Sequence, residues 1–179
     1  MVEYGIDIEI EKIRRHLLKN LGWLGVEIFG RAYKNVSKEG NLVPEVYIGN
    51  GEYKEILTSD LKSVTVFFVD SDKHTKANSL EMQTDLSVVF IVNLVKLKGN
   101  NNTRLDALVQ HEVLSTLKQT TQFEISELTK GLDALKEFDT SKIKLSDMQP
   151  YHIFSVTGKI KYKINKYEQT ICGVSRKQN

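Results

Sequence analysis

The residues best suited to chemistry lie in a short polar stretch between two apolar segments. Asp70, Asp72 and His74 alternate along residues 70–79 (DSDKHTKANS), and Glu81 follows. An Asp-x-Asp loop can hold a hard cation through oxygen ligands. The stretch lacks the glycine and the distant glutamate of a calcium-binding loop, so an exposed hairpin loop is the favoured interpretation. A metal-dependent enzyme using these four residues is the alternative, and cation binding by the loop stays open.

The other reactive residues lack the neighbours that a catalytic site needs. His111-Glu112 begins like a metalloprotease helix, but that motif requires a second histidine at the position of Ser115. The single cysteine, Cys172, has no histidine nearby in the sequence and excludes an intramolecular disulfide. The glycine-containing turn at 49–51 lies between two extended runs, whereas a phosphate loop joins a strand to a helix. We therefore expect a non-enzymatic protein without a cofactor.

A row of lysines marks the last strand expected in the chain. Lys159, Lys161 and Lys163 occupy alternate positions and so share one strand face. Such a face can contact phosphates or an acidic partner, and exposed lysines also protect a strand against unwanted edge pairing. The net charge of +2 gives no overall basic field to recruit nucleic acid or an anionic membrane. A nucleic-acid-binding module using these lysines is a third hypothesis, which salt-dependent affinity would reveal.

The composition is that of an ordinary globular protein, with 40% apolar and 27% charged residues in a chain of 179. The first residues are acidic and form no apolar core of a signal peptide. The longest apolar run, 88–92, is much shorter than the roughly 20 residues that span a bilayer. We therefore expect neither a signal peptide nor a membrane contact, and the lone cysteine fits a reducing cytoplasm.

Hydrophobic periodicity predicts the elements that position these residues. Apolar side chains at spacings of three and four predict helices over 6–24, 105–117 and 126–138, with Thr103 and Ser126 as caps of the last two. Alternating or β-branched runs predict strands over 25–33, 44–49, 53–57, 63–69, 85–97 and 151–167. The strand at 85–97 is apolar on both faces, so we expect helices or a neighbouring subunit to cover it on both sides.

These elements predict an α+β fold, a mostly antiparallel sheet with the amphipathic helices packed on one face. Residues 1–167 are expected to form one domain that carries a helical insertion at about 120–149. Residues 168–179 are expected to form a flexible polar tail.

The order of the elements resembles a known family. The N-terminal helix is followed by VPEVYIG, by SVTVFFV and DLSVVFIVNLVKL around the polar loop, by the helix RLDALVQHEVLSTLK and by the strand YHIFSVTGKIKYKI. This layout is similar to the tail-terminator, or tail-completion, proteins of the neck of long-tailed bacteriophages. The resemblance covers roughly residues 6–165 and rests on element order and size.

The resemblance implies a non-enzymatic virion structural protein that is assembled in the host cytoplasm. Such proteins form a ring, commonly a hexamer, that caps the tail tube and joins it to the head connector. The implied partners are other copies of the chain, the tail tube protein and the connector proteins. DNA would pass through the lumen without specific binding. Another head–tail adaptor or a head-completion protein is the alternative within this class.

The expected interface combines the polar loop with the lysine face. It comprises Asp70, Asp72, Lys73, His74, Lys76, Lys159, Lys161 and Lys163. We expect the loop 70–79 to reach a neighbouring subunit or the tube and to become ordered only on assembly. Deletion of residues 71–78 would then leave thermal stability nearly unchanged.

Overall fold

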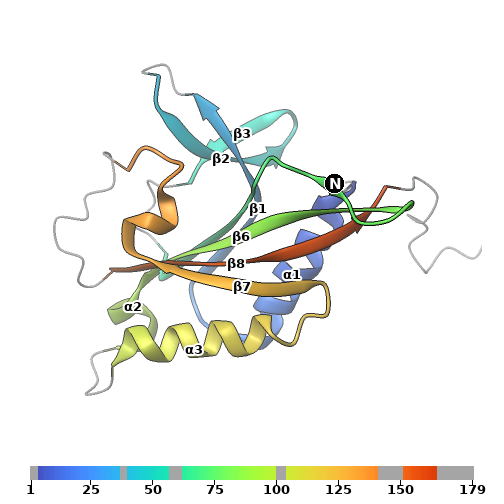
Figure 1. The fold of residues 1–179 in the computed structure, drawn as a ribbon. Helices are drawn as coiled ribbons and strands as arrows, with labels where there is room; N and C mark the ends of the chain where they lie inside the picture. The colour runs from blue at the N-terminus through green and yellow to red at the C-terminus, as the bar shows by residue number, and fades with distance from the viewer. Residues whose placement is uncertain (1–3, 37–39, 57–61, 100–103, 141–150, 165–179) are drawn as a thin grey trace, which may run out of the picture.

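The computed structural model describes residues 4–36, 40–56, 62–99, 104–140 and 151–164. Within these ranges the protein is a mixed α and β structure with three α-helices and one eight-stranded, mostly antiparallel sheet (Figure 1). No helix in the described part of the chain is long and apolar enough to cross a membrane.

The sheet order places the first three strands at one end and the last two at the other. In chain order the elements are α1 (Ile6–Asn20), β1 (Val26–Val36), β2 (Leu42–Gly49), β3 (Glu52–Glu55), β4 (Val64–Asp70), β5 (Thr75–Lys76), β6 (Glu81–Asn93), α2 (Leu94–Lys98), α3 (Leu105–Leu117), β7 (Phe123–Lys130), the 3-10 helix η1 (Gly131–Leu135) and β8 (Tyr151–Lys163). The strands lie in the order β3-β2-β1-β4-β6-β8-β7, and β5 pairs with β6. Only the β1–β4 pair is parallel among these, and β3 and β7 are the two edges.

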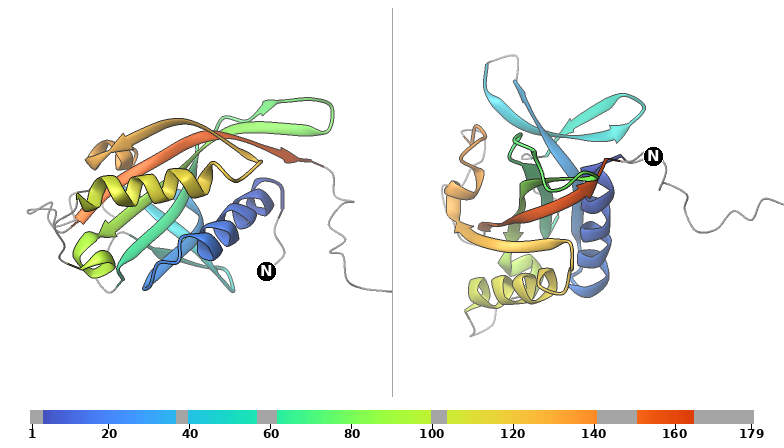
Figure 2. Two further views of the ribbon diagram at one scale, coloured as in Figure 1. Left: turned by 90° about the horizontal axis from the view of Figure 1, so that it is seen from below. Right: turned by 45° about the vertical axis from the view of Figure 1, so that its right-hand side comes forward.

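The main core lies between the sheet and the helices α1 and α3, which share one face (Figures 1 and 2). The apolar stripe of α1, which includes Ile10 and Leu17, packs on this face together with Val113 of α3. Every second side chain of β6 and β8 meets them, including Phe90 and Phe154, whose rings stack with centroids 4.9 Å apart. The expectation of amphipathic helices on one face of a mostly antiparallel sheet is confirmed.

A second, smaller core covers the opposite face. Phe67, Val89 and Ile153 point to this side and pack against Leu135 and Phe138, which follow β7. Strand β4 is buried at all seven positions because both of its faces are covered. The same chain thus covers both faces of β6, as its two-sided apolar sequence requires.

The helix predicted over 126–138 is wrong. Residues Phe123–Lys130 form strand β7 and Gly131–Leu135 form a short 3-10 helix. The register of β7 against β8 shifts between Ile125 and Glu127, which is a β-bulge at Ser126. Ser126 therefore caps no helix, and its hydroxyl donates to the carbonyl oxygen of Thr157 at 3.1 Å. The bulge interrupts the alternation of buried and exposed side chains along β7. The remaining leucines are spaced three and four residues apart, as in an amphipathic helix.

One predicted strand and one predicted helix also end earlier than expected. The strand predicted over 85–97 ends at Asn93, whose side chain accepts a hydrogen bond from the amide of Lys96 at 2.9 Å and caps α2. The first helix ends at Asn20 instead of residue 24. Helix α3 matches the range predicted for it, 105–117. Thr103, Cys172 and the predicted tail at 168–179 lie outside the described residues.

Candidate functional site

The polar loop after β4 is tied to the body of the molecule. Asp70 is the last residue of β4 and is only 6% exposed, so it is no part of an exposed loop. Its Oδ2 lies 3.0 Å from His74 Nε2 and 3.5 Å from Nη1 of Arg31. His74 Nδ1 lies 2.8 Å from the hydroxyl of Tyr162 on β8. Burial and the nearby Asp70 charge raise the pKa of Tyr162, which keeps this hydroxyl a neutral hydrogen-bonding group.

Further contacts hold the rest of the loop. The Thr84 hydroxyl donates to the carbonyl oxygen of Lys73 at 3.0 Å and lies 3.0 Å from the Ser71 hydroxyl. Residues Thr75–Lys76 form β5 and pair with β6. The loop is therefore anchored within the single chain, contrary to the expectation that it becomes ordered only on assembly. A contact of its exposed side chains, such as Lys73 and Lys76, with a neighbouring subunit stays a prediction.

The acidic residues of the loop region each bind a different partner. The Asp72 carboxylate accepts a hydrogen bond from Lys34, and Glu81 accepts one from the Asn78 amide at 2.7 Å. Burial lowers the pKa of Lys34, but its ion pairs with Asp72 and Glu137 outweigh burial and hold that pKa above its ordinary value. Within the described ranges no three His, Cys, Asp or Glu side chains converge as a metal ion would need. Of the proposed cation ligands, the structure brings together Asp70 and His74.

The lysine face of β8 is flanked by carboxylates. Lys159, Lys161 and Lys163 are exposed on alternate positions of β8, as predicted. In the sheet register, Lys159 lies between Asp85 of β6 and Glu124 of β7, and Lys163 lies opposite Glu81. Opposite charges at cross-strand positions stabilise a sheet and reduce its net field. The face is therefore a mixed-charge surface, which disfavours non-specific phosphate binding.

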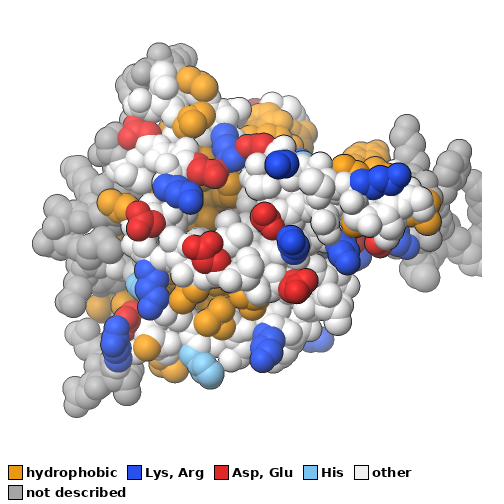
Figure 3. Space-filling view, in the orientation of Figure 1, with side chains coloured by type: hydrophobic (Ala, Val, Ile, Leu, Met, Phe, Trp, Pro, Cys, Tyr) orange, Lys and Arg blue, Asp and Glu red, His pale blue; other side chains and the backbone are white. Residues whose placement is uncertain are grey.

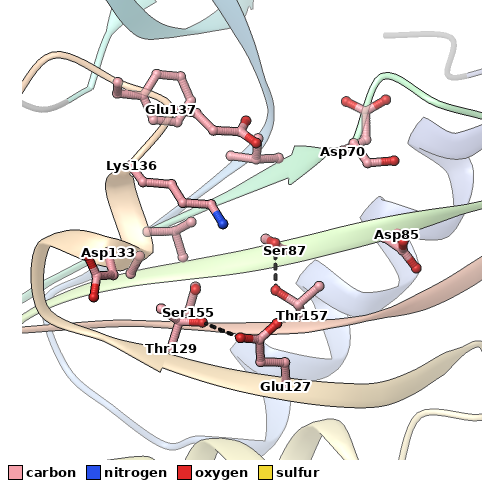
Figure 4. A pocket seen from close by; sticks show the side chains of 15 residues that line it. Asp70, Asp85, Ser87, Glu127, Thr129, Asp133, Lys136, Glu137, Ser155 and Thr157 are labelled. Carbon is pink, nitrogen blue, oxygen red and sulfur yellow. Dashed lines mark hydrogen bonds between the residues drawn. The ribbon is translucent and has the colours of Figure 1, made fainter.

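A polar cavity of about 200 Å³ lies on the sheet face opposite the helices (Figure 4). The hydroxyls of Ser87 and Thr157 lie 2.7 Å apart, and Thr129 donates to Glu127 at 3.3 Å. The side chain of Lys136 extends into the cavity from the segment after η1. This lining favours water and small polar groups. This cavity is not expected from the sequence, because the leucine spacing predicts a helix over 126–138 where the structure has β7 and η1.

An aromatic surface lies on the projecting end of the sheet, formed by the far end of β1 with β2 and β3 (Figures 1 and 2). Tyr33, Tyr47 and Tyr53 come from these three strands and are 38%, 38% and 47% exposed. The Tyr53 ring centroid lies 5.4 Å from that of Tyr33 and 5.3 Å from that of Tyr47. We call these three residues the tyrosine face. The signal in the sequence was Tyr47, which alternates with Val46 and Ile48 before the turn at 49–51.

Contacts with neighbouring residues fix the side chains of the tyrosine face. The Arg31 guanidinium lies 5.2 Å from the centre of the Tyr33 ring, and its Nε donates to Asp7 of α1 at 2.9 Å. Burial lowers the pKa of Arg31, but the carboxylates of Asp7 and Asp70 outweigh burial and raise it. The Tyr47 hydroxyl accepts a hydrogen bond from the Gly51 amide at 3.1 Å. These contacts hold the aromatic rings in place before any partner binds.

No protein-family model matches the chain, and no curated protein matches it either. The geometry of the described residues therefore carries the functional argument.

Proposed function

We propose that the chain is a non-enzymatic structural subunit that forms a homo-oligomeric ring at the neck of a long-tailed bacteriophage. The ring, commonly of six subunits, would cap the tail tube and join it to the head connector. The observation that carries this proposal is the tyrosine face, a preformed aromatic surface that the described part of the chain leaves exposed.

Exposed aromatic clusters of this kind favour a binding role. Tyrosine is enriched in protein interfaces because it contributes a large apolar area and a hydrogen-bonding tip at a small entropic cost. The three rings are held by the contacts described above and lie on a projection away from the helix-covered core. Aromatic side chains that stabilise a fold are normally buried by other parts of the same chain.

The sheet also leaves two edges, at β3 and β7, within the described part of the chain. Two different edges at opposite ends suit a head-to-tail contact, in which each subunit offers one end to each neighbour. Such a contact gives a ring when the rotation closes and a filament when it does not. The phage assignment itself is supported by the resemblance in element order. That order differs from the expected one at β7, where the chain has a strand in place of the predicted helix.

The proposal is tested by the oligomeric state of the full purified chain. Sedimentation velocity over a dilution series, followed by negative-stain electron microscopy, should give one closed ring of fixed subunit number. A strictly monomeric chain at the highest concentration would contradict the proposal, and open filaments would contradict the closed ring. Purified rings should then bind the end of tail tubes assembled from the tube protein of the same phage.

A further inference from the structure

The polar cavity on the sheet face opposite the helices has a floor of hydroxyl groups and a charged rim (Figure 4). Its floor includes Ser87, Ser155 and Thr157, and its rim carries the exposed side chains of Glu127 and Lys136. The volume of about 200 Å³ far exceeds the roughly 10–15 Å³ that one ordered water needs. Pockets for drug-sized ligands are larger, at about 300–1,000 Å³. The cavity therefore has the size for a small polar molecule.

The hydroxyl of Ser155 is a buried polar group without a partner. The residue is only 4% exposed and lines the cavity from β8. The neighbouring hydroxyls of Ser87 and Thr157 lie within hydrogen-bond distance of each other, whereas that of Ser155 bonds to no residue that the structure describes. The only fully enclosed side-chain atom without a partner in the described ranges is Oε2 of Glu9, so the Ser155 oxygen has access to the cavity. Because buried polar groups are normally paired, this hydroxyl is available to a bound molecule.

The rim also offers charges of both signs that have no partner. Lys136 and Glu127 form no ion pair with any described residue, and neither do Asp85 and Asp133, which line the same cavity. Figure 3 shows acidic side chains gathered on this face of the molecule, with lysine and arginine side chains among them. A molecule in the cavity thus meets one ammonium group and several carboxylates.

This combination of charges narrows the class of ligand. An inorganic anion would be attracted by Lys136 but repelled by the carboxylates, and a simple amine would be repelled by Lys136. Within the described ranges no three side chains converge as a metal ion would need. In Figure 4 Lys136 enters from the segment after η1 and Glu127 from β7, so the two charges lie on different sides of the cavity. A molecule that carries one charge of each sign satisfies both.

We propose that this cavity binds a small zwitterion of the α-amino-acid class. The ligand carboxylate accepts hydrogen bonds from the Lys136 ammonium and the Ser155 hydroxyl, and the ligand ammonium donates to the Glu127 carboxylate. Charge-assisted hydrogen bonds of this kind are the strong ones in proteins. None of these residues belongs to the tyrosine face, so the site does not depend on the proposed ring.

The first test is ligand binding to the full purified chain. Isothermal titration calorimetry with each common α-amino acid should find at least one that binds with a dissociation constant of about 1 mM or lower. The best binder is then compared with its decarboxylated amine and its deaminated acid, each of which lacks one of the two charges. Both analogues should bind at least about tenfold more weakly, because each leaves one charged contact unmade.

Three substitutions assign the contacts. Glu127→Gln removes the charge but keeps an oxygen that can accept from Thr129, and Lys136→Met removes the ammonium. Each should raise the dissociation constant about tenfold or more, the usual effect of losing a hydrogen bond to a charged group. Ser155→Ala should raise it about two- to tenfold. Its urea midpoint should equal or exceed that of the wild type, because the lost hydroxyl has no partner in the described part of the chain.

Matched controls make the same changes outside the cavity. Glu124→Gln and Lys130→Met lie at exposed positions of β7 that do not line it, and should bind as the wild type does. Weaker binding in the three cavity variants alone, with folding intact by circular dichroism, supports the site. The inference is overturned if no α-amino acid binds, if either single-charge analogue binds as tightly as the amino acid, or if the cavity variants bind as well as the controls.

Discussion

The helix-covered face of the sheet and the tyrosine face use aromatic residues in opposite ways. Phe90 and Phe154 stack beneath α1 and α3, fully buried among aliphatic side chains. Tyr33, Tyr47 and Tyr53 contact one another at similar distances but stay open to solvent. Burial of apolar area drives folding, whereas exposed aromatic area is free to drive association. Under the proposed function, stability and assembly would be located in different parts of the chain, and substitutions should damage them separately.

The largest expected effect is the loss of a ring from the helix-covered core. Phe90→Ala should lower the free energy of unfolding by about 3–5 kcal/mol, because the cavity left beneath the helices cannot collapse fully. Tyr53→Ser on the tyrosine face should cost about 1 kcal/mol, the usual scale of an aromatic pair contact. Urea denaturation of both variants measures the difference. Equal losses would mean that the tyrosine face stabilises the fold as much as the core does.

The next effect concerns the close approach of β7 and β8. A Cβ atom added at Gly158 would lie 2.5 Å from the carbonyl oxygen of Glu124 and 2.9 Å from the Phe123 ring. Gly158→Ala should therefore lower the free energy of unfolding by about 1–3 kcal/mol. Gly30→Ala is the control, since a Cβ there meets nothing within 4 Å. A thermal melt that shows no difference between the two variants would rule out this tight strand contact.

The anchored loop should show a smaller effect. Asp70→Ala removes the buried acceptor of His74 and one of the two carboxylates beside Arg31, and should cost about 1–3 kcal/mol. Asp72→Ala removes a carboxylate that is 69% exposed, and should cost less than about 1 kcal/mol. Chemical denaturation at neutral pH compares the two. If both variants were as stable as the wild type, the loop would be the dispensable segment that the sequence suggested.

The smallest expected effect is a dependence on pH near the end of the sheet. Burial lowers the pKa of His152, with opposing influence from Asp106, and its ring stacks on Phe154 with centroids 5.1 Å apart. A depressed pKa means that folding favours the neutral ring. Its contribution is present above the ordinary value of 6.5 and is lost as the pH falls through the lowered pKa. The stability difference between wild type and His152→Gln should therefore shrink on acidification. A difference that stays constant from pH 7.5 to 5 would contradict a depressed pKa.

The sequence predicted the elements whose signals are local and continuous. Alternation placed Phe154, Val156 and Ile160 on the buried face of β8 correctly, and the stripe of α1 was equally clear. Strand β7 was mistaken for a helix because the bulge at Ser126 breaks its alternation, and pairing with β8 outweighs local preference. The tyrosine face depends on which strands lie side by side at one end of the sheet. Periodicity along the chain does not contain that information.

The central claim is that the projecting strands serve assembly and the helix-covered core serves the fold. Hydrogen–deuterium exchange of the wild-type chain at a dilute and a concentrated condition compares both regions in one measurement. We expect amide exchange to slow with concentration in β2 and β3, and to stay unchanged in β4. Slowing confined to β4 and α1, or exchange that is independent of concentration everywhere, would contradict the claim.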